Sequence, residues 1–240
     1  MPRKTIRVLP ALFLSPVVLL ALIAARRPPI SAVDATYRLD STDNLEIINT
    51  RAEIVAYRGR QALHLGPPPN ANADHDRGSL IALINNSSFK NGAIEAEVAG
   101  LPITSMDPTA RGFVGLVFRA QPHAAKAENI YLRPTNGRAD DQLRRNHSVQ
   151  YESMPEFPWH RLRREQPGVY ESYVDLDPGA WTKMKIEVHG TNAKLYVDGA
   201  AQPCLIVNDL KLGDSRGQIG LWAFIATDAY FSNLKITNAD

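Results

Sequence analysis

The chain lacks a second cysteine. Only one of its 240 residues is a cysteine, so no disulfide bond can form within the chain. Cys204 lies in the run Pro-Cys-Leu-Ile-Val, which is typical of the start of a buried strand, and we interpret it as a packed side chain rather than a nucleophile. The fold must therefore be held together by apolar burial, for which a hydrophobic content of 44% is sufficient.

The spacings that mark metal and nucleotide sites are also missing. None of the six histidines forms a His-x-His or His-x-x-x-His pair. Asp74-His75-Asp76 resembles a group of metal ligands, but it lies in a loop rich in Pro and Asn, where solvation is the simpler interpretation. No glycine-rich phosphate loop follows a strand. We expect no cofactor and no metal at the functional site.

Long apolar runs are rare, and the clearest lies at the N-terminus. The first seven residues carry three basic side chains and no acid, an apolar run over residues 8–25 follows, and small residues come next. This order is typical of a secretory signal peptide. The alternative is an uncleaved membrane anchor, because the run is close to the shortest length that spans a bilayer. We therefore divide the chain into a leader over 1–32 and one domain over 33–240, exported to the periplasm or the extracellular space.

The basic excess of the whole chain comes from this leader. Five of the 27 Lys and Arg residues lie within residues 1–32, where there is no acid. The remaining domain has 22 basic against 25 acidic residues, so it is slightly acidic. This charge gives no support for nucleic-acid binding, and we expect membrane contact only through a retained leader.

The rest of the chain shows the alternation of strands. In Gly112 to Ala120, for example, Val114, Leu116 and Phe118 share one face and Val117 lies on the other. No stretch beyond the leader shows convincing helical periodicity, and many short strands with regular turns predict an all-β, two-sheet antiparallel sandwich. We predict strands over residues 45–49, 52–57, 61–65, 79–84, 93–98, 112–120, 129–133, 147–151, 170–176, 181–189, 193–197, 205–207, 218–225 and 230–236.

Five segments carry a family resemblance. They are Trp181–Gly199 with its Leu-Tyr-Val-Asp-Gly ending, Gly217–Trp222 with Tyr230–Ile236, and Phe89–Val98 followed by Gly112–Arg119. With these hairpins the chain, from about Asp34 onward, resembles the concanavalin A-like lectin and glucanase (laminin G-like) superfamily, and most closely the bacterial exported domains described as 3-keto-disaccharide hydrolase-like. The resemblance implies a concanavalin A-like jelly roll and leaves room for a structural calcium. It does not specify chemistry, because the superfamily contains lectins, hydrolases, lyases and adhesion modules.

Sugar-binding side chains gather between residues 131 and 171. Amides and guanidinium groups bind hydroxyls, aromatic rings stack on sugars, and Arg also binds carboxylate or sulfate. If Ile130 and Leu132 face the core, Tyr131 and Arg133 face outward on the exposed, concave face of a sheet. The alternative is that the charged residues form surface ion pairs around long loops. The predicted ligand-binding residues are Arg119, Tyr131, Arg133, Gln142, Arg145, Asn146, Gln150, Tyr151, Trp159 and Tyr170.

Catalytic carboxylates are harder to identify. Glu95 and Glu97 share a strand face, but the third acid of the glucanase pattern is missing because position 100 is Gly, so we interpret them as part of a solvated face. Glu171 is the best-placed single carboxylate for acid–base chemistry. The sequence thus favours an exported carbohydrate-binding sandwich. The alternatives are a glycoside hydrolase that acts on a disaccharide or polysaccharide through Glu171, and a non-catalytic structural or adhesion module.

Overall fold

The computed structural model describes residues 33–71 and 78–239. The predicted leader and the Asp74-His75-Asp76 loop lie outside the described residues. Within the described ranges, no helix is both long and apolar enough to cross a membrane.

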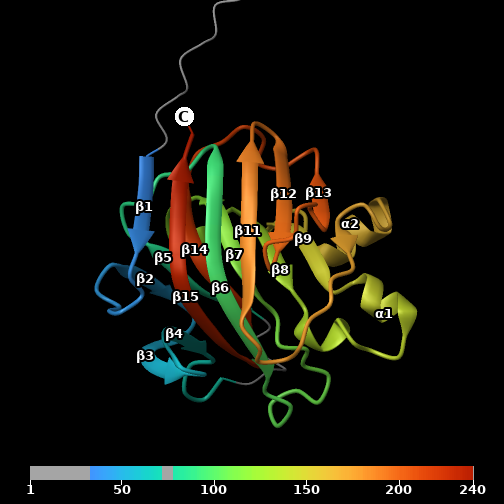
Figure 1. The fold of residues 1–240 in the computed structure, drawn as a ribbon, viewed down its shortest axis with the longest axis horizontal. Helices are drawn as coiled ribbons and strands as arrows, with labels where there is room; N and C mark the ends of the chain where they lie inside the picture. The colour runs from blue at the N-terminus through green and yellow to red at the C-terminus, as the bar shows by residue number, and fades with distance from the viewer. Residues whose placement is uncertain (1–32, 72–77, 240) are drawn as a thin grey trace, which may run out of the picture.

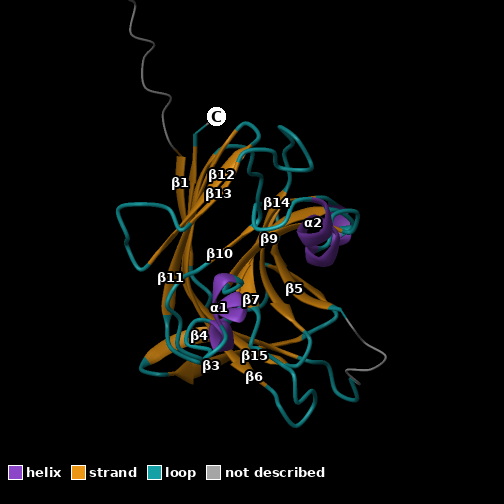
Figure 2. Cartoon of the chain, turned by 90° about the vertical axis from the view of Figure 1, so that its right-hand side faces the viewer, coloured by secondary structure: helices purple, strands orange, loops and turns teal. Residues whose placement is uncertain are grey.

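Two antiparallel sheets form the body of the molecule, and Figure 2 shows them as two layers. Sheet A has the spatial order β13 (Leu205–Val207), β12 (Asn192–Val197), β11 (Thr182–His189), β6 (Gly92–Pro102), β15 (Thr227–Asn238), β4 (Arg60–Gly66) and β3 (Arg51–Tyr57), and β1 (Val33–Tyr37) also pairs with β15. Sheet B has the order β10 (Glu171–Ser172), β9 (Val149–Met154), β8 (Ala127–Leu132), β7 (Val114–Ala120), β14 (Gln218–Phe224), β5 (Ser79–Ile84) and β2 (Leu45–Ile48). The predicted two-sheet antiparallel sandwich is confirmed.

Short helical segments interrupt the strand pattern. These are α1 (Gln142–Asn146), α2 (Trp159–Glu165) and the 3-10 turns η1 (Pro122–Ala124) and η2 (Pro134–Asn136). Figure 1 shows α1 and α2 on the side of the molecule that carries β9. The prediction of no helix was wrong here, because five- and seven-residue helices are too short to show a 3.6-residue period.

The main core lies between the two sheets. Alternate residues of sheet B strands enter it, for example Leu116 and Phe118 of β7 and Ile130 and Leu132 of β8. They meet Met184, Ile186 and Val188 of β11 and other inward residues of sheet A. This is the face assignment that the alternation predicted.

Sheet B is also buried on its outer face. A second apolar cluster there contains Tyr131 of β8, Trp222 of β14 and Ile81 and Leu83 of β5, each on the opposite side of its strand from the main core. The rings of Tyr131 and Trp222 lie 4.7 Å apart between centroids. Antiparallel sheets usually leave one face to water, so a second covered face marks this side of sheet B as unusual.

Gly115 allows Tyr131 to lie close against the sheet. Gly115 pairs with Tyr131 across β7 and β8, and a Cβ added to Gly115 would lie 2.5 Å from the Cβ of Tyr131. Such a contact forces the strands or the ring to move. The glycine therefore helps to set the position of the Tyr131 ring.

We predict that Gly115→Ala lowers the free energy of unfolding by about 1–3 kcal/mol, because the added methyl group overpacks the outer face of sheet B. Urea denaturation followed by tryptophan fluorescence measures this change. Gly66→Ala is the matched control, since its nearest contact would be the His64 ring at 3.2 Å, and it should cost less. Equal stability of the wild type and Gly115→Ala would contradict the prediction.

Candidate functional site

Arg133 lies just after β8 and is the centre of a polar group on the outer side of sheet B. Its Nη2 donates to the Tyr131 hydroxyl at 3.0 Å and to Gln150 Oε1 at 3.0 Å, and its Nη1 donates to the His147 carbonyl at 3.2 Å. The Arg133 side chain is only 3% exposed. These bonds fix a buried cation at the junction of β8 and β9.

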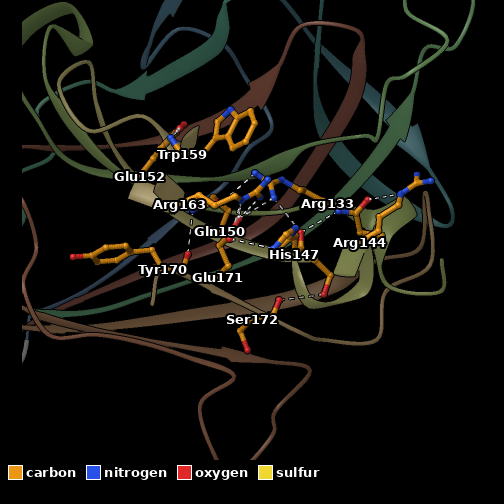
Figure 3. Close-up of polar contacts among 12 residues, drawn as sticks. Arg133, Arg144, His147, Gln150, Glu152, Trp159, Arg163, Tyr170, Glu171 and Ser172 are labelled. Carbon is orange, nitrogen blue, oxygen red and sulfur yellow. Dashed lines mark hydrogen bonds and ion pairs between the residues drawn. The ribbon is translucent and has the colours of Figure 1, made fainter. Parts of the chain in front are cut away.

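Glu171 of β10 faces this cation. Glu171 pairs with Gln150 of β9, which places both side chains on the same side of sheet B. Arg163 Nε lies 3.0 Å from each Glu171 carboxylate oxygen, Arg133 Nη1 lies 3.5 Å from Oε1, and His147 Nε2 lies 3.3 Å from Oε2. Figure 3 shows these groups converging on the carboxylate.

The Trp159 ring borders the polar group, and a second partly exposed ring, Tyr173, follows Glu171 closely in the sequence. The guanidinium carbons of Arg163 and Arg133 lie 4.6 Å and 5.5 Å from the centroid of the Trp159 ring. Trp159 remains 38% exposed, and Tyr173, two residues after Glu171, is 41% exposed. We name Arg133, Gln150, Trp159, Arg163, Glu171 and Tyr173 together the Arg133 site.

Several buried polar atoms beside Arg133 have no hydrogen-bond partner among the described residues. They are Arg133 Nε, Asn129 Oδ1 and Trp222 Nε1. Asn129 and Trp222 extend from β8 and β14 toward the same side of sheet B as Tyr131. Buried polar atoms are rarely left unpaired in folded proteins, so these three atoms are open to a hydrogen bond from a ligand or an ordered water.

A second carboxyl group lies on the same face. Glu152 of β9 is 7% exposed and accepts hydrogen bonds from Asn129 Nδ2 at 3.1 Å and from the Trp159 backbone N–H at 3.2 Å. Burial raises the pKa of Glu152 above its ordinary value, and the hydrogen bonds from Asn129 and Trp159 only partly oppose this. Glu152 and Glu171 thus occupy contrasting surroundings, one held by neutral donors and the other by cations.

His147 responds to the same surroundings. Burial lowers the pKa of His147; Glu171 opposes this by favouring the charged ring, while Arg163 and Arg133 lower the pKa further. The imidazole therefore stays neutral to lower pH than a free histidine.

Tyr131 and Arg133 lie on the predicted side of the sheet, but the prediction that they are exposed was wrong. Tyr131 is 1% exposed and Arg133 is 2% exposed. Arg133 is packed against the rings of Phe113, Tyr131 and Trp159. Alternation predicts the side of a strand, whereas the cover comes from α2 and the loop before β7, which lie elsewhere in the sequence.

Three further predicted residues do not join the Arg133 site. Tyr151 and Tyr170 belong to the main core, and their hydroxyls bond to Glu128 and to Asp209. Arg119 is fully buried and donates to the carbonyls of Lys90, Gly190 and Gly213. The ligand-binding patch predicted from the sequence therefore does not include Arg119, Tyr151 or Tyr170.

A backbone irregularity explains the position of Arg119. Its φ is +51°, and the pairing of β14 with β7 shifts register between Gln218 and Gly220. A bulge of this kind re-aims a side chain, so simple alternation fails at this residue.

The predicted residues of α1 form local contacts beside the site. Gln142 Nε2 donates to Asn146 Oδ1 at 2.7 Å, and Arg145 Nη2 donates to the Tyr173 hydroxyl at 3.0 Å. Arg145 thus supports one bordering ring, while the amides of Gln142 and Asn146 remain exposed on the helix.

Sequence reasoning missed Arg163, Tyr173, Glu152 and Arg111. For Arg163 a signal exists: it follows Trp159 by four residues, which places both on one face of a helix once that helix is recognised. Arg111 gives no such signal, because it reaches the site from the loop between β6 and β7.

A cavity of about 460 Å³ lies on the outer face of sheet A. It is open, and the charged residues among its lining pair with one another: Lys183 with Glu95 at 2.7 Å and Lys185 with Glu187 at 2.7 Å. Glu97 pairs with Arg60 on the same sheet, so Glu95 and Glu97 belong to the predicted charged face. We favour the Arg133 site over this cavity because three unpaired buried polar atoms lie near Arg133, whereas none of the described residues that line the cavity carries such an atom.

No group of three or more His, Cys, Asp or Glu side chains in the described part of the chain has the geometry to hold a metal ion.

Comparison with known proteins defines the fold. No protein-family model and no curated protein matches the chain. Among solved structures, it resembles the carbohydrate-binding module CBM66 from Bacillus subtilis (17% identity, TM-score 0.55, covering 80% of this chain and 95% of that one). It also resembles a protein of unknown function with a galectin-like fold from Bacillus subtilis (12% identity, TM-score 0.56, covering 87% of this chain and 98% of that one). A third similar structure is that of Crh5 transglycosylase in complex with NAG (12% identity, TM-score 0.52, covering 88% of this chain and 86% of that one). At these identities the likeness is one of fold, and the predicted concanavalin A-like resemblance is confirmed at that level.

We predict that the pKa of His147, measured by NMR titration, lies below 6.5 and rises in Arg163→Gln, because a like charge is removed and Glu171 is released toward the imidazole. Glu171→Gln should lower it further. Arg164→Gln, which removes an exposed charge from the same helix, is the matched control and should leave it unchanged. A fall in Arg163→Gln would show that His147 does not face these groups.

Proposed function

We propose that the protein is an exported carbohydrate-binding β-sandwich that binds a glycan at the Arg133 site. The observation that carries this proposal is the position of the partly exposed Trp159 ring against the guanidinium groups of Arg133 and Arg163, beside the buried Gln150 and Glu171. The fold likeness to a carbohydrate-binding module supports it, and the N-terminal leader pattern supports export.

The chemistry of the site suits sugars. An exposed indole or phenol ring stacks on the apolar face of a sugar ring, as apolar surface does in most ligand sites. Arg163, with 32% of its side chain exposed, offers guanidinium donors to hydroxyl oxygens. Because Arg133 and Glu171 hold Arg163 and Trp159 in place, little order is lost on binding.

A second candidate function is glycoside hydrolysis, and the pair Glu152 and Glu171 favours it. Glu171 lies opposite Gln150, and Glu152 is two residues further along β9, so the two residues are diagonal neighbours on one face with backbones about 7–8 Å apart by strand geometry. Inverting glycosidases use acids about 6.5–9.5 Å apart. Glu152, with its raised pKa, would be the acid, and Glu171 the base.

We predict that Trp159→Ala and Tyr173→Ala each weaken glycan binding at least about tenfold, a loss of about 1.4 kcal/mol, because each removes a stacking surface. A glycan array identifies the ligand and calorimetry measures the affinity. Ile206→Ala, an equally exposed apolar residue of sheet A, is the control and should bind normally. If the wild type binds no glycan in the array, the third interpretation, a structural or adhesion module, replaces this proposal.

For the hydrolase, we predict that Glu152→Gln abolishes product release from the bound glycan while leaving its affinity within about twofold, since only the transferable proton is lost. Chromatography of the digested glycan measures release. Glu95→Gln on sheet A is the control and should keep full activity. Binding without any product in the wild type would rule out catalysis and leave the binding proposal intact.

A further inference from the structure

Cationic groups outnumber anionic ones around the Arg133 site. The charges of Arg133, Arg144 and Arg163 all act on Arg111. The charges of Arg111, Arg133 and Arg163 also act on His147. Only Glu171 forms ion pairs with members of this group among the described residues. Asp107 acts on Arg111 from a distance, and Glu152 on Arg133.

Arg111 has no partner in this arrangement. No hydrogen bond or ion pair joins its guanidinium to any described residue, although its backbone carbonyl accepts from Thr135 N–H at 3.4 Å and so holds it next to η2. Arg144, by contrast, donates to Asn136 Oδ1 at 3.0 Å and to Thr135 Oγ1 at 3.2 Å. Arg111 is half-buried, and burial together with Arg144, Arg133 and Arg163 lowers its pKa.

The Arg111 guanidinium is repelled by three neighbouring guanidinium groups, and no described residue offsets this with an ion pair. Arg133 contributes a second unused donor, because its buried Nε has no hydrogen-bond partner among the described residues. An oxyanion between these groups would supply acceptors for both and offset the repulsion. Arg is the residue that binds carboxylate and sulfate in this way, through two parallel N–H donors.

We propose that the Arg133 site recognises the oxyanion of an acidic sugar, a carboxylate or a sulfate ester, through Arg111 together with Arg133. This proposal rests on the proposed glycan-binding function and names its substrate class. Trp159 and Tyr173 contact the sugar ring, Arg111 binds the charge, and a neutral glycan leaves Arg111 unpaired.

The anion can be tested separately from the sugar. We titrate the full chain with sodium glucuronate and with sodium sulfate, each against sodium chloride at equal ionic strength, and follow the arginine side-chain N–H signals and His147 by NMR. We expect saturable shifts at Arg111 and Arg133 and a rise in the pKa of His147, because the anion offsets the nearby positive charge. Response to glucuronate alone assigns a carboxylate, and response to sulfate alone assigns a sulfate ester.

Arg111→Gln should weaken this binding at least about tenfold, and Arg164→Gln, the matched loss of an exposed charge, should not. With oligosaccharides, an oligogalacturonate should bind more tightly than its methyl ester to the wild type and equally to Arg111→Gln. Shifts that chloride reproduces, or an unchanged affinity in Arg111→Gln, would overturn the anion proposal.

The two proposals fail in different ways. If neutral glycans bind in a Trp159-dependent manner and Arg111→Gln changes nothing, the glycan function stands and the anion proposal is wrong. If glucuronate or sulfate binds through Arg111 while no oligosaccharide binds, the anion site stands and the glycan function is wrong.

Discussion

The Arg133 guanidinium is the interaction on which the outer side of sheet B depends. It connects the end of β8 to Gln150 of β9 and to Glu171 of β10, and it lies against the rings of Phe113, Tyr131 and Trp159. A buried charge is stabilised when its donors are bonded and an opposite charge is near, and Arg133 meets both conditions except at Nε, which has no partner among the described residues. Glu171 supplies that charge, and Arg163 then binds Glu171 from the solvent side. The order of the whole group therefore follows from one buried cation.

The two sheets differ in what their outer faces present. Around its cavity, sheet A presents paired Lys and Glu side chains to solvent, which satisfy one another and leave little for a ligand to gain. Sheet B presents a second apolar cluster and, near Arg133, three unpaired polar atoms under partial cover. Burying an aromatic ring is favourable, whereas burying a polar atom without a hydrogen-bond partner costs free energy of hydration. This difference is why the functional proposals concern sheet B.

Most of the fold could be predicted from the sequence, because strand alternation is a local property. Every predicted strand is present, although the one over 170–176 is reduced to Glu171–Ser172, and β1 and the two short helices were not predicted. The candidate site could be predicted only in part. Arg133, Gln150 and Glu171 come together because register pairs β8, β9 and β10, and Trp159 joins them from α2. Arg119 departs at a bulge, and Arg111 arrives through a loop; both depend on long-range packing that no local pattern encodes.

The strand order interleaves the two ends of the domain. β15 lies between β6 and β4 and also pairs with β1, while β14 lies between β7 and β5. Neither sheet can therefore be completed until the last two strands have left the ribosome, and until then the inward residues of β4 to β7 have no permanent cover. Folding must close long loops before it gains most of its contacts, so it is expected to be slow. A refolding rate well below that of a helical protein of similar size is therefore the kinetic consequence of this interleaved strand order.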